Sequence, residues 1–307
     1  MAATALIAID WGTTSARAYR VDAAGAVLDS RSAPLGIQNV QDGRFGDALA
    51  TLLADWRHDR APRIACGMIG SRQGWIEAPY VGCPATLADL IAGIVSAPAG
   101  ALAVVPGVQT RDAYGLPDVM RGEETQIVGA VDEREERVLA ALPGTHSKWA
   151  FVASGRIVDF LTLMTGEIWS VLLRHSILGR LATPPPTQGV GPAYAKGVAR
   201  GLGAGNLTHD MFGARTLALT GELAGEDVSD WLSGLMIGRE VRNARTWAQR
   251  DGYDGARVRL IGDDALVTRY ALALAQADVT VERAHPHAAA HGLWRIAVRT
   301  GIVGDPP

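Results

Sequence analysis

The chain has 307 residues, of which 48% are hydrophobic and 20% are charged, enough apolar material for one large or two medium domains. Its formal net charge is only −3, and it has no basic stripe with interleaved aromatic residues, which argues against a nucleic-acid partner. No apolar run is long enough to cross a bilayer, and the first residues lead into a predicted strand without a leader. These features favour a cytoplasmic protein and leave its oligomeric state open, a homo-oligomer included.

The first predicted elements are two short apolar strands joined by a tight turn. The turn residues are Gly12, Thr13, Thr14 and Ser15. Backbone N–H groups and hydroxyls that point out of such a turn form a cradle for phosphate oxygens, although an ordinary hairpin has the same pattern. Asp10 ends the first strand, where its carboxylate could hold Mg²⁺ through water, because Mg²⁺ keeps several waters and binds few carboxylates.

The next part of the chain alternates predicted helices and strands, which indicates an α/β lobe. Helical spacing covers residues 45–57, and a buried strand over 63–70 ends in a polar loop. A helix over 87–95 and a strand over 101–105 follow. A loop then opens a helix within residues 118–130, and the charged run 132–137 is predicted to be a surface crossing between two lobes.

A second copy of the strand–turn–strand pattern begins at Val138, close to half a chain length after the first. Its turn contains Gly144, Thr145 and Ser147, and Lys148 follows as one of only two lysines in the chain. A lysine is a compact point charge suited to phosphate oxygens. The pair of turns predicts an N-terminal lobe over 1–137 and a C-terminal lobe over 138–307, which grip one nucleotide between them.

The remaining elements are mostly helical. The spacing predicts helices over residues 166–178, 217–223, 228–246 and 265–277, and a strand over 258–262. The segment 183–205 is rich in Pro and Gly and is predicted to be a mobile loop or flap.

These motifs carry a resemblance to a known family. The segment Asp10–Ser15 resembles the first phosphate motif of the superfamily of sugar kinases, heat-shock chaperones and actin, and the whole chain is similar to 2-dehydro-3-deoxygalactonokinases. The similar segments, in the expected order, are IAIDWGTTSARAY (7–19), GMIGSRQGW (67–75), VPGVQTRD (105–112), VMRGEETQIVGA (119–130), LPGTHSKW (142–149), DFLTLMTGE (159–167), FGARTLAL (212–219), LSGLMIGREV (232–241) and LIGDDALVTRY (260–270).

The resemblance implies an α/β protein with a two-lobed, actin-like ATPase (ribonuclease H-like) fold and ATP in the cleft between the lobes. The implied activity is magnesium-dependent phosphoryl transfer from ATP to the 6-hydroxyl of a small molecule, 2-dehydro-3-deoxy-D-galactonate, in galactonate degradation and galactose metabolism. A kinase of the same fold for another sugar or 2-keto-3-deoxy acid, such as a gluconate-derived one, is the alternative. A regulatory ATPase is a further one, and turnover that depends on a sugar acid would discriminate against it.

The resemblance also implies roles for particular residues. In glycerol-kinase-like members the base is an aspartate in the segment that Gly122–Gln126 matches here, so Glu123 is the first candidate base and Glu124 the second, followed by Asp159 and Glu167. An arginine suits a substrate carboxylate. Gly262 ends a strand as the glycine of an adenosine-binding turn would. The candidate sugar-acid residues are Arg72 with Ser71, Gln73 and Trp75, and, as alternates, Arg17 and Arg121.

Overall fold

A computed structural model of the chain describes residues 3–184 and 190–304, which form two compact units. Unit 1 comprises Met1–Glu136, Phe151–Phe160 and His285–Pro307, and unit 2 comprises Arg137–Ala150 and Leu161–Ala284. The lobes predicted from the sequence meet at a single boundary after residue 137. Unit 1, by contrast, is assembled from three separate segments, so the C-terminal residues group with the N-terminal ones.

The larger sheet of unit 1 has six strands in the order β3-β2-β1-β4-β8-β7. In chain order these strands are β1 (Leu6–Trp11), β2 (Ala16–Val21), β3 (Val27–Ala33), β4 (Arg63–Gly67), β7 (Val95–Ser96) and β8 (Ala103–Val104). Strand β1 is antiparallel to β2 and parallel to β4. The strands β5 (Tyr80–Gly82), β9 (Gly107–Arg111) and β10 (Pro117–Met120) form a smaller sheet in the order β10-β9-β5.

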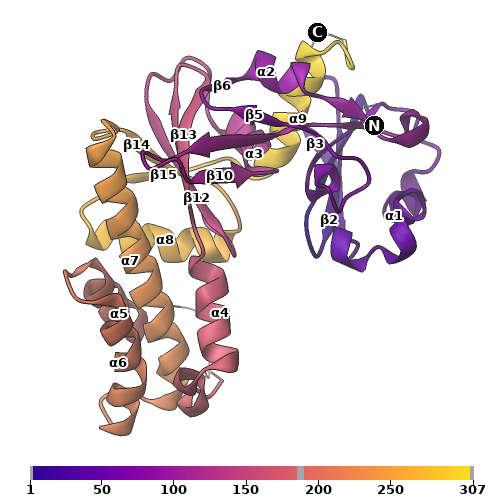
Figure 1. The fold of residues 1–307 in the computed structure, drawn as a ribbon. Helices are drawn as coiled ribbons and strands as arrows, with labels where there is room; N and C mark the ends of the chain where they lie inside the picture. The colour runs from indigo at the N-terminus through magenta and orange to yellow at the C-terminus, as the bar shows by residue number, and fades with distance from the viewer. Residues whose placement is uncertain (1–2, 185–189, 305–307) are drawn as a thin grey trace. The chain divides into compact units, whose positions relative to one another are not determined.

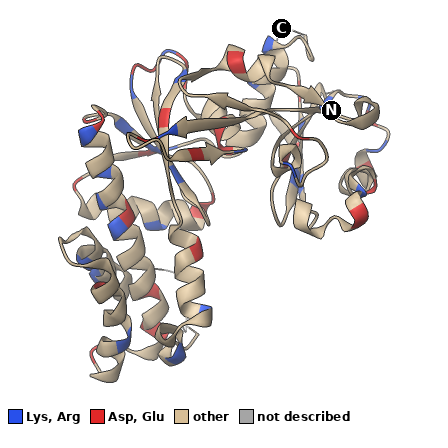
Figure 2. Cartoon of the chain, in the orientation of Figure 1, with Lys and Arg blue, Asp and Glu red and all other residues tan. Residues whose placement is uncertain are grey.

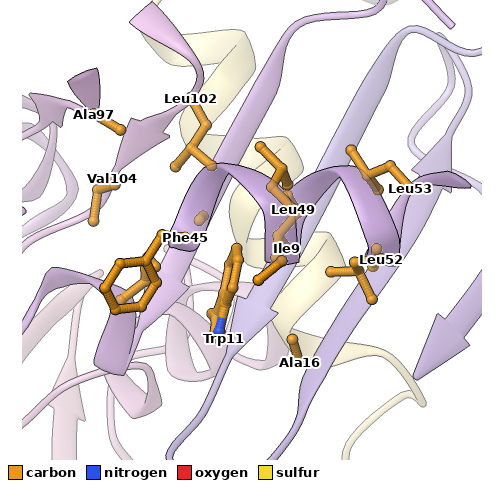
Figure 3. Packing of buried hydrophobic residues seen from close by; sticks show 14 of the residues in the cluster. Ile9, Trp11, Ala16, Phe45, Leu49, Leu52, Leu53, Ala97, Leu102 and Val104 are labelled. Atoms are coloured by element: carbon orange, nitrogen blue, oxygen red, sulfur yellow. The ribbon is translucent and has the colours of Figure 1, made fainter. Parts of the chain in front are cut away.

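Strand β1 is the centre of unit 1 because both of its faces are buried. Successive side chains of a strand point to opposite faces, so Ile7, Ile9 and Trp11 enter one core and Leu6 and Ala8 enter another. Helix α1 (Phe45–Leu52) covers the first face, as Figure 3 shows for its apolar side chains. The sequence of a strand that is buried on both faces is typically a continuous apolar run, and β1 has this pattern over Leu6–Ile9.

The second face of β1 is covered by the C-terminal helix α9 (Ala288–Arg299), which also packs against α3 (Glu123–Ala130). The two helices approach closely at glycines. A Cβ added to Gly292 would lie 1.9 Å from the Thr125 carbonyl oxygen, and one added to Gly129 would lie 2.0 Å from that of Ala288. This contact ties the end of the chain to unit 1. Unit 1 also contains the helix α2 (Leu87–Ala92).

The third sheet has the order β15-β14-β11-β12-β13-β6. Its strands are β6 (Ala85–Thr86), β11 (Val138–Leu142), β12 (Ser147–Ala153), β13 (Arg156–Leu163), β14 (Arg257–Leu260) and β15 (Val281–Arg283). The division into units passes through β12 and β13. Within unit 2, β11, β14 and β15 are parallel neighbours, so their carboxyl ends lie at one edge of the sheet.

Helices make up most of the rest of unit 2. They are α4 (Thr165–His175), α5 (Pro192–Leu202), α6 (Leu207–Leu219), α7 (Val228–Arg250) and α8 (Asp264–Gln276). Helices α4, α5 and α6 lie alongside the long helix α7 (Figure 1). The predicted flap over 183–205 is therefore wrong where it covers α5, while its residues 185–189 lie outside the described part of the chain.

The glycines of α5 serve close packing. A Cβ added to Gly197 would lie 2.1 Å from the Trp231 carbonyl oxygen on α7, and one added to Gly201 would lie 2.3 Å from that of Leu235. Glycine normally weakens a helix, which is why the composition of this segment suggested a loop. Here it allows two helix backbones to touch.

The remaining elements confirm the α/β alternation with shifted ends. The helix predicted over 87–95 ends at Ala92, and the helix predicted over 217–223 corresponds to the end of α6. Acidic and basic residues are interspersed along both units (Figure 2). Among the described residues, no helix combines the length and apolar character needed to cross a membrane.

Candidate active site

In unit 1, the ends of β1 and β4 and the start of α3 meet at two glycines. Gly67 ends β4 with φ 91°, and Gly122 precedes α3 with φ 110°, both in the region that favours glycine. A Cβ added to Gly122 would lie 3.2 Å from the Gly67 Cα, and one added to Gly67 would lie 3.5 Å from an Asp10 carboxylate oxygen. The carboxylate of Asp10 is therefore next to the segment that carries Glu123 and Glu124.

Asp10 lies at the end of β1, opposite Arg17 of β2 and beside Cys66 of β4. Burial raises the pKa of Asp10, and the positive charge of Arg17 opposes that shift. The pKa of the Cys66 thiol is raised by burial and then by the negative charges of Asp10, Glu124 and Glu123. These three carboxylates consequently all lie near Cys66.

The two glutamates that begin α3 have different environments. Glu124 is fully buried; its Oε2 accepts a hydrogen bond from the Gly122 N–H at 2.6 Å, and its Oε1 accepts one from the Thr125 hydroxyl at 2.8 Å. Glu123 is only partly buried, and its Oε2 accepts from the Arg121 backbone N–H at 3.0 Å. Of the two carboxylates, Glu123 is the more accessible.

The protonation of Glu124 follows from its surroundings. Burial, and after it the charge of Glu123, raise the pKa of Glu124 to about 8, against the opposing effect of its hydrogen bonds. At neutral pH its carboxyl is therefore largely protonated. A neutral Glu124 beside a charged Glu123 avoids placing two negative charges at one helix start.

The oxygen of Asp10 is a donor of the kind that Mg²⁺ prefers. Within the described part of the chain, no group of three or more His, Cys, Asp or Glu side chains is arranged to hold a metal ion. A magnesium ion at Asp10 would therefore take its other ligands from water and phosphate, as Mg²⁺ at phosphate sites commonly does.

The first glycine-hydroxyl turn is fixed from one side. The N–H groups of Ile37 and Gln38 donate to the carbonyls of Gly12 and Thr13, each at 3.1 Å, and the Asn39 side chain donates to the Thr14 carbonyl at 2.9 Å. In a trans peptide the N–H points opposite to the carbonyl. The N–H groups of residues 13–15 are thus directed away from the supporting segment, and the side chains at 13 and 14 are exposed.

The loop after β4 holds the first-choice sugar-acid residues. Arg72 and Gln73 are exposed, and the Arg72 Nε lies 3.4 Å from Glu77 Oε1 in a surface ion pair. Trp75 stacks on Phe45 of α1, with ring centroids 6.2 Å apart. Phe45 in turn meets the Trp11 ring edge-on at 6.2 Å, so this loop is packed onto the strand that leads into the first turn.

The second turn, in unit 2, leaves its glycine in open space. The nearest atom to a Cβ added at Gly144, apart from its chain neighbours, would be the His146 carbonyl oxygen at 4.0 Å. The φ of Gly144 does not lie in the left-handed region. Thr145 and His146 are exposed. Gly166 of α4 packs beneath, where a Cβ would lie 2.5 Å from the Gly144 carbonyl oxygen.

Gly262 lies beside this turn. It follows β14, the parallel neighbour of β11, and has φ 145°. A Cβ added to it would lie 3.6 Å from the Pro143 carbonyl oxygen. The turn and Gly262 thus occupy adjacent carboxyl ends of parallel strands, the edge at which open α/β sheets commonly bind ligands.

Ser147 and Lys148 point away from the exposed side of the turn. The Ser147 hydroxyl is buried and lies 2.9 Å from the Tyr270 hydroxyl, which donates to Glu240 Oε2 at 2.8 Å. The buried Lys148 donates to the Thr162 hydroxyl at 2.8 Å. Both side chains are engaged inside unit 2.

Glu240 and Tyr270 were not among the site residues predicted from the sequence. Trp149 also donates to Glu240, at 2.8 Å to Oε1, and this network lies directly beneath the second turn. Burial raises the pKa of Glu240, and the hydrogen bonds from Thr165, Trp149, Tyr270 and Ser147 oppose that shift. In the sequence, the feature that could have indicated this network is Glu240 itself, a charged residue on the apolar face of the helix predicted over 228–246.

The two remaining candidate bases have other partners. Asp159 accepts from the Thr110 hydroxyl at 2.6 Å. Glu167 forms an ion pair with His146. The structure therefore brings Asp10, Glu123 and Glu124 together in unit 1, and Gly144, Ser147 and Gly262 together in unit 2.

The raised pKa of Glu124 gives the protein a pH-dependent stability. Because the pKa of Glu124 is about 8 in the folded protein and 4.5 for an ordinary glutamate side chain, the folded state binds one more proton than the unfolded state between these two pH values. The free energy of unfolding should therefore fall as pH rises through this window, by up to about 1.4 kcal/mol per pH unit. In Glu124→Gln that component should be absent, which urea unfolding across the window would measure. Glu77→Gln, at an exposed site, is the control, and equal slopes for wild type and Glu124→Gln would contradict the assignment.

Comparison with known proteins finds relatives over nearly the whole chain. Residues 10–296 match the family model described as 2-keto-3-deoxy-galactonokinase. The Escherichia coli protein named 2-dehydro-3-deoxygalactonokinase is 35% identical over 271 residues, which cover 86% of this chain and 87% of that protein. A Rhizobium meliloti protein named "Probable 2-dehydro-3-deoxygalactonokinase DgoK1" is 36% identical over 301 residues, which cover 94% of this chain and 97% of that protein.

Solved structures give the same grouping. A Sinorhizobium meliloti crystal structure assigned to the same activity is 33% identical, with a TM-score of 0.83 and coverage of 96% of this chain and 98% of that one. An activator of 2-hydroxyisocaproyl-CoA dehydratase from Clostridium difficile with bound ADPNP has a TM-score of 0.52 at 12% identity, covering 96% of this chain and 95% of that one, and shares the fold alone. The fold is that of the actin-like ATPases and sugar kinases, and the chain belongs to the 2-keto-3-deoxy-galactonokinase family.

Proposed function

We propose that this protein transfers the terminal phosphoryl group of ATP to the 6-hydroxyl of 2-dehydro-3-deoxy-D-galactonate. Family membership supports the reaction class and the substrate. The observation that carries the chemistry is a partly exposed carboxylate, Glu123, beside Asp10 at the meeting point of β1, β4 and α3. A cytoplasmic location stays a prediction.

In this proposal Glu123 orients the acceptor hydroxyl. The oxygen at C6 forms the new bond to phosphorus while the bond from phosphorus to the bridging oxygen of ATP breaks, and the hydroxyl proton passes to Glu123. The Arg121 backbone N–H, which donates to Glu123 Oε2, holds this carboxylate in one orientation. Positioning of this kind accounts for much of the catalysis in phosphoryl transfer.

The phosphates are proposed to bind at the two glycine-hydroxyl turns, and the adenosine near Gly262. In the first turn, the N–H groups of residues 13–15 are the donors. Asp10 would hold Mg²⁺, which supplies positive charge against the phosphate oxygens. Ser147 and Lys148 are proposed to support the second turn from inside unit 2, through their hydrogen bonds with Tyr270 and Thr162.

The substrate assignment is tested by a coupled kinase assay with ATP and a panel of 2-keto-3-deoxy acids. We expect the galactonate-derived acid to give the highest kcat/KM, and ATP turnover without a sugar acid to be negligible. A clear preference for the gluconate-derived acid would reassign the substrate within the same fold. ATP turnover that no sugar acid stimulates would favour a regulatory ATPase.

The base assignment is tested by comparing two isosteric variants. Glu123→Gln retains size and hydrogen bonding but cannot accept a proton, so kcat should fall by at least about 10²-fold with little change in the substrate KM. Glu124→Gln should be milder, because both Glu124 oxygens already have partners inside the protein. If Glu124→Gln were the inactive variant and Glu123→Gln active, the two roles would be exchanged.

The phosphate turn is tested at Gly144. Nothing in the fold opposes a side chain there, so Gly144→Val should fold normally while its side chain blocks phosphate from the turn. We expect ATP affinity, measured by calorimetry, to fall by about 10-fold or more, as for the loss of a charge-assisted hydrogen bond. Gly82→Val, at an exposed glycine also in open space, is the matched control. Unchanged ATP affinity in a folded Gly144→Val protein would remove this turn from the nucleotide site.

A further inference from the structure

Arg121 has a guanidinium group that the folded chain does not satisfy. The residue is only 8% exposed, and its Nε and Nη1 atoms are buried without a hydrogen-bond partner. Its Nη2 donates to the Ala78 carbonyl at 2.9 Å, and its Cζ lies 4.2 Å from the centroid of the Tyr80 ring. In the described part of the chain no carboxylate forms an ion pair with it, although an unpaired buried charge is strongly unfavourable.

A second unsatisfied group lies close by. The Ser71 hydroxyl is also buried without a partner. Ser71 follows Gly70, where an added Cβ would lie 3.0 Å from the Arg121 Nη1. A guanidinium and a hydroxyl are both donors to an anion such as a carboxylate.

We propose that Arg121, with Ser71, binds the carboxylate of the sugar-acid substrate, an inference that rests on the proposed kinase function. The main chain of Arg121 donates to Glu123, the residue proposed to meet the hydroxyl at the other end of the substrate. From Cα to Cζ an arginine has as many bonds as a six-carbon chain has from C1 to C6. A substrate of this length is thus of the size needed to reach from the Glu123 carboxylate to the guanidinium.

The other candidate arginines are less suitable. Arg72 is 86% exposed at its side chain and already pairs with Glu77, and an exposed ion pair contributes little. Arg17 is exposed and its charge acts on Asp10. A charge interaction in a buried setting is stronger than one at the surface, so Arg121 offers more discrimination in favour of an acid.

Access to the guanidinium depends on one aromatic ring and one loop. The Tyr80 ring that stacks on it belongs to a residue 38% exposed. The loop over residues 71–77 closes through the Ala78 N–H, which donates to the Gly70 carbonyl at 2.9 Å. The proposal therefore requires the Tyr80 ring or this loop to move when the substrate binds, and partly exposed side chains reorient rapidly.

The test measures selectivity for charge. Wild type should use the sugar acid with a kcat/KM far above that for its neutral C1 carboxamide. In Arg121→Gln, kcat/KM for the acid should fall by about 10²-fold, the size expected when a charge-assisted hydrogen bond is lost, while the value for the carboxamide changes little. The acid-to-amide ratio therefore collapses, and the KM for ATP stays the same. If Arg121 had a purely structural role, the substitution would lower kcat/KM for the acid and for the carboxamide by the same factor.

Two further variants keep the proposal falsifiable. Ser71→Ala is a small change that should fold and should reduce the same ratio by about 10-fold, and Arg72→Gln should leave it unchanged. If the ratio is unaltered in Ser71→Ala and in any folded Arg121→Gln enzyme, the carboxylate binds elsewhere. If it collapses in Arg72→Gln instead, that arginine holds the carboxylate. A wild type that phosphorylates neither compound overturns the proposed function itself, and this inference with it.

Discussion

The contact between Gly67 and Gly122 is the constraint on which the candidate active site depends. A Cβ added to Gly67 would lie 2.7 Å from the Trp11 carbonyl oxygen, and one added to Gly122 would lie 3.2 Å from the Gly67 Cα. Side chains at these positions would push β1, β4 and the start of α3 apart. Because both residues are glycine, Asp10 and Glu123 reach the same strand end from segments more than a hundred residues apart.

This concentration of carboxylates has an electrostatic consequence. Like charges that share a buried site cannot all ionise easily, and burial raises the pKa of both Asp10 and Glu124. The helix start favours negative charge, but it does not fully offset burial. Glu124 therefore keeps its proton and closes its hydrogen bonds internally, while Glu123 stays the more accessible of the two carboxylates. Two adjacent glutamates thus differ in accessibility because their surroundings differ.

Sequence reasoning predicted the local motifs better than the contacts between them. The two strand–turn–strand units are where the pattern placed them, because alternating burial and glycine turns are local properties. The return of α9 to unit 1 and the helix hidden in the Pro- and Gly-rich segment 183–205 were not predictable in this way. Both depend on glycines that let helix backbones touch, such as Gly292 and Gly197, and composition alone does not separate a packing glycine from a flexible one.

The same limit applied to the candidate site residues. Ser147 and Lys148 fit a phosphate turn by sequence, yet successive side chains of a strand point to opposite faces, and here both are engaged within the protein. Their roles depend on Tyr270, Glu240 and Thr162, which are distant along the chain. Only a folded structure brings these groups under the turn.

The features that the fold does not require are the ones that point to ligands. At Gly197 and Gly292 a side chain would collide with the protein itself, so packing explains the glycine. At Gly144 it would collide with nothing; Gly82 is equally free, so open space acquires meaning only at a turn on the carboxyl edge of the sheet. Arg121 presents the converse case, a buried charge with unused donors. At Arg121 the folded chain leaves donors unused, which a carboxylate would satisfy, and at Gly144 it leaves space that a phosphate would occupy.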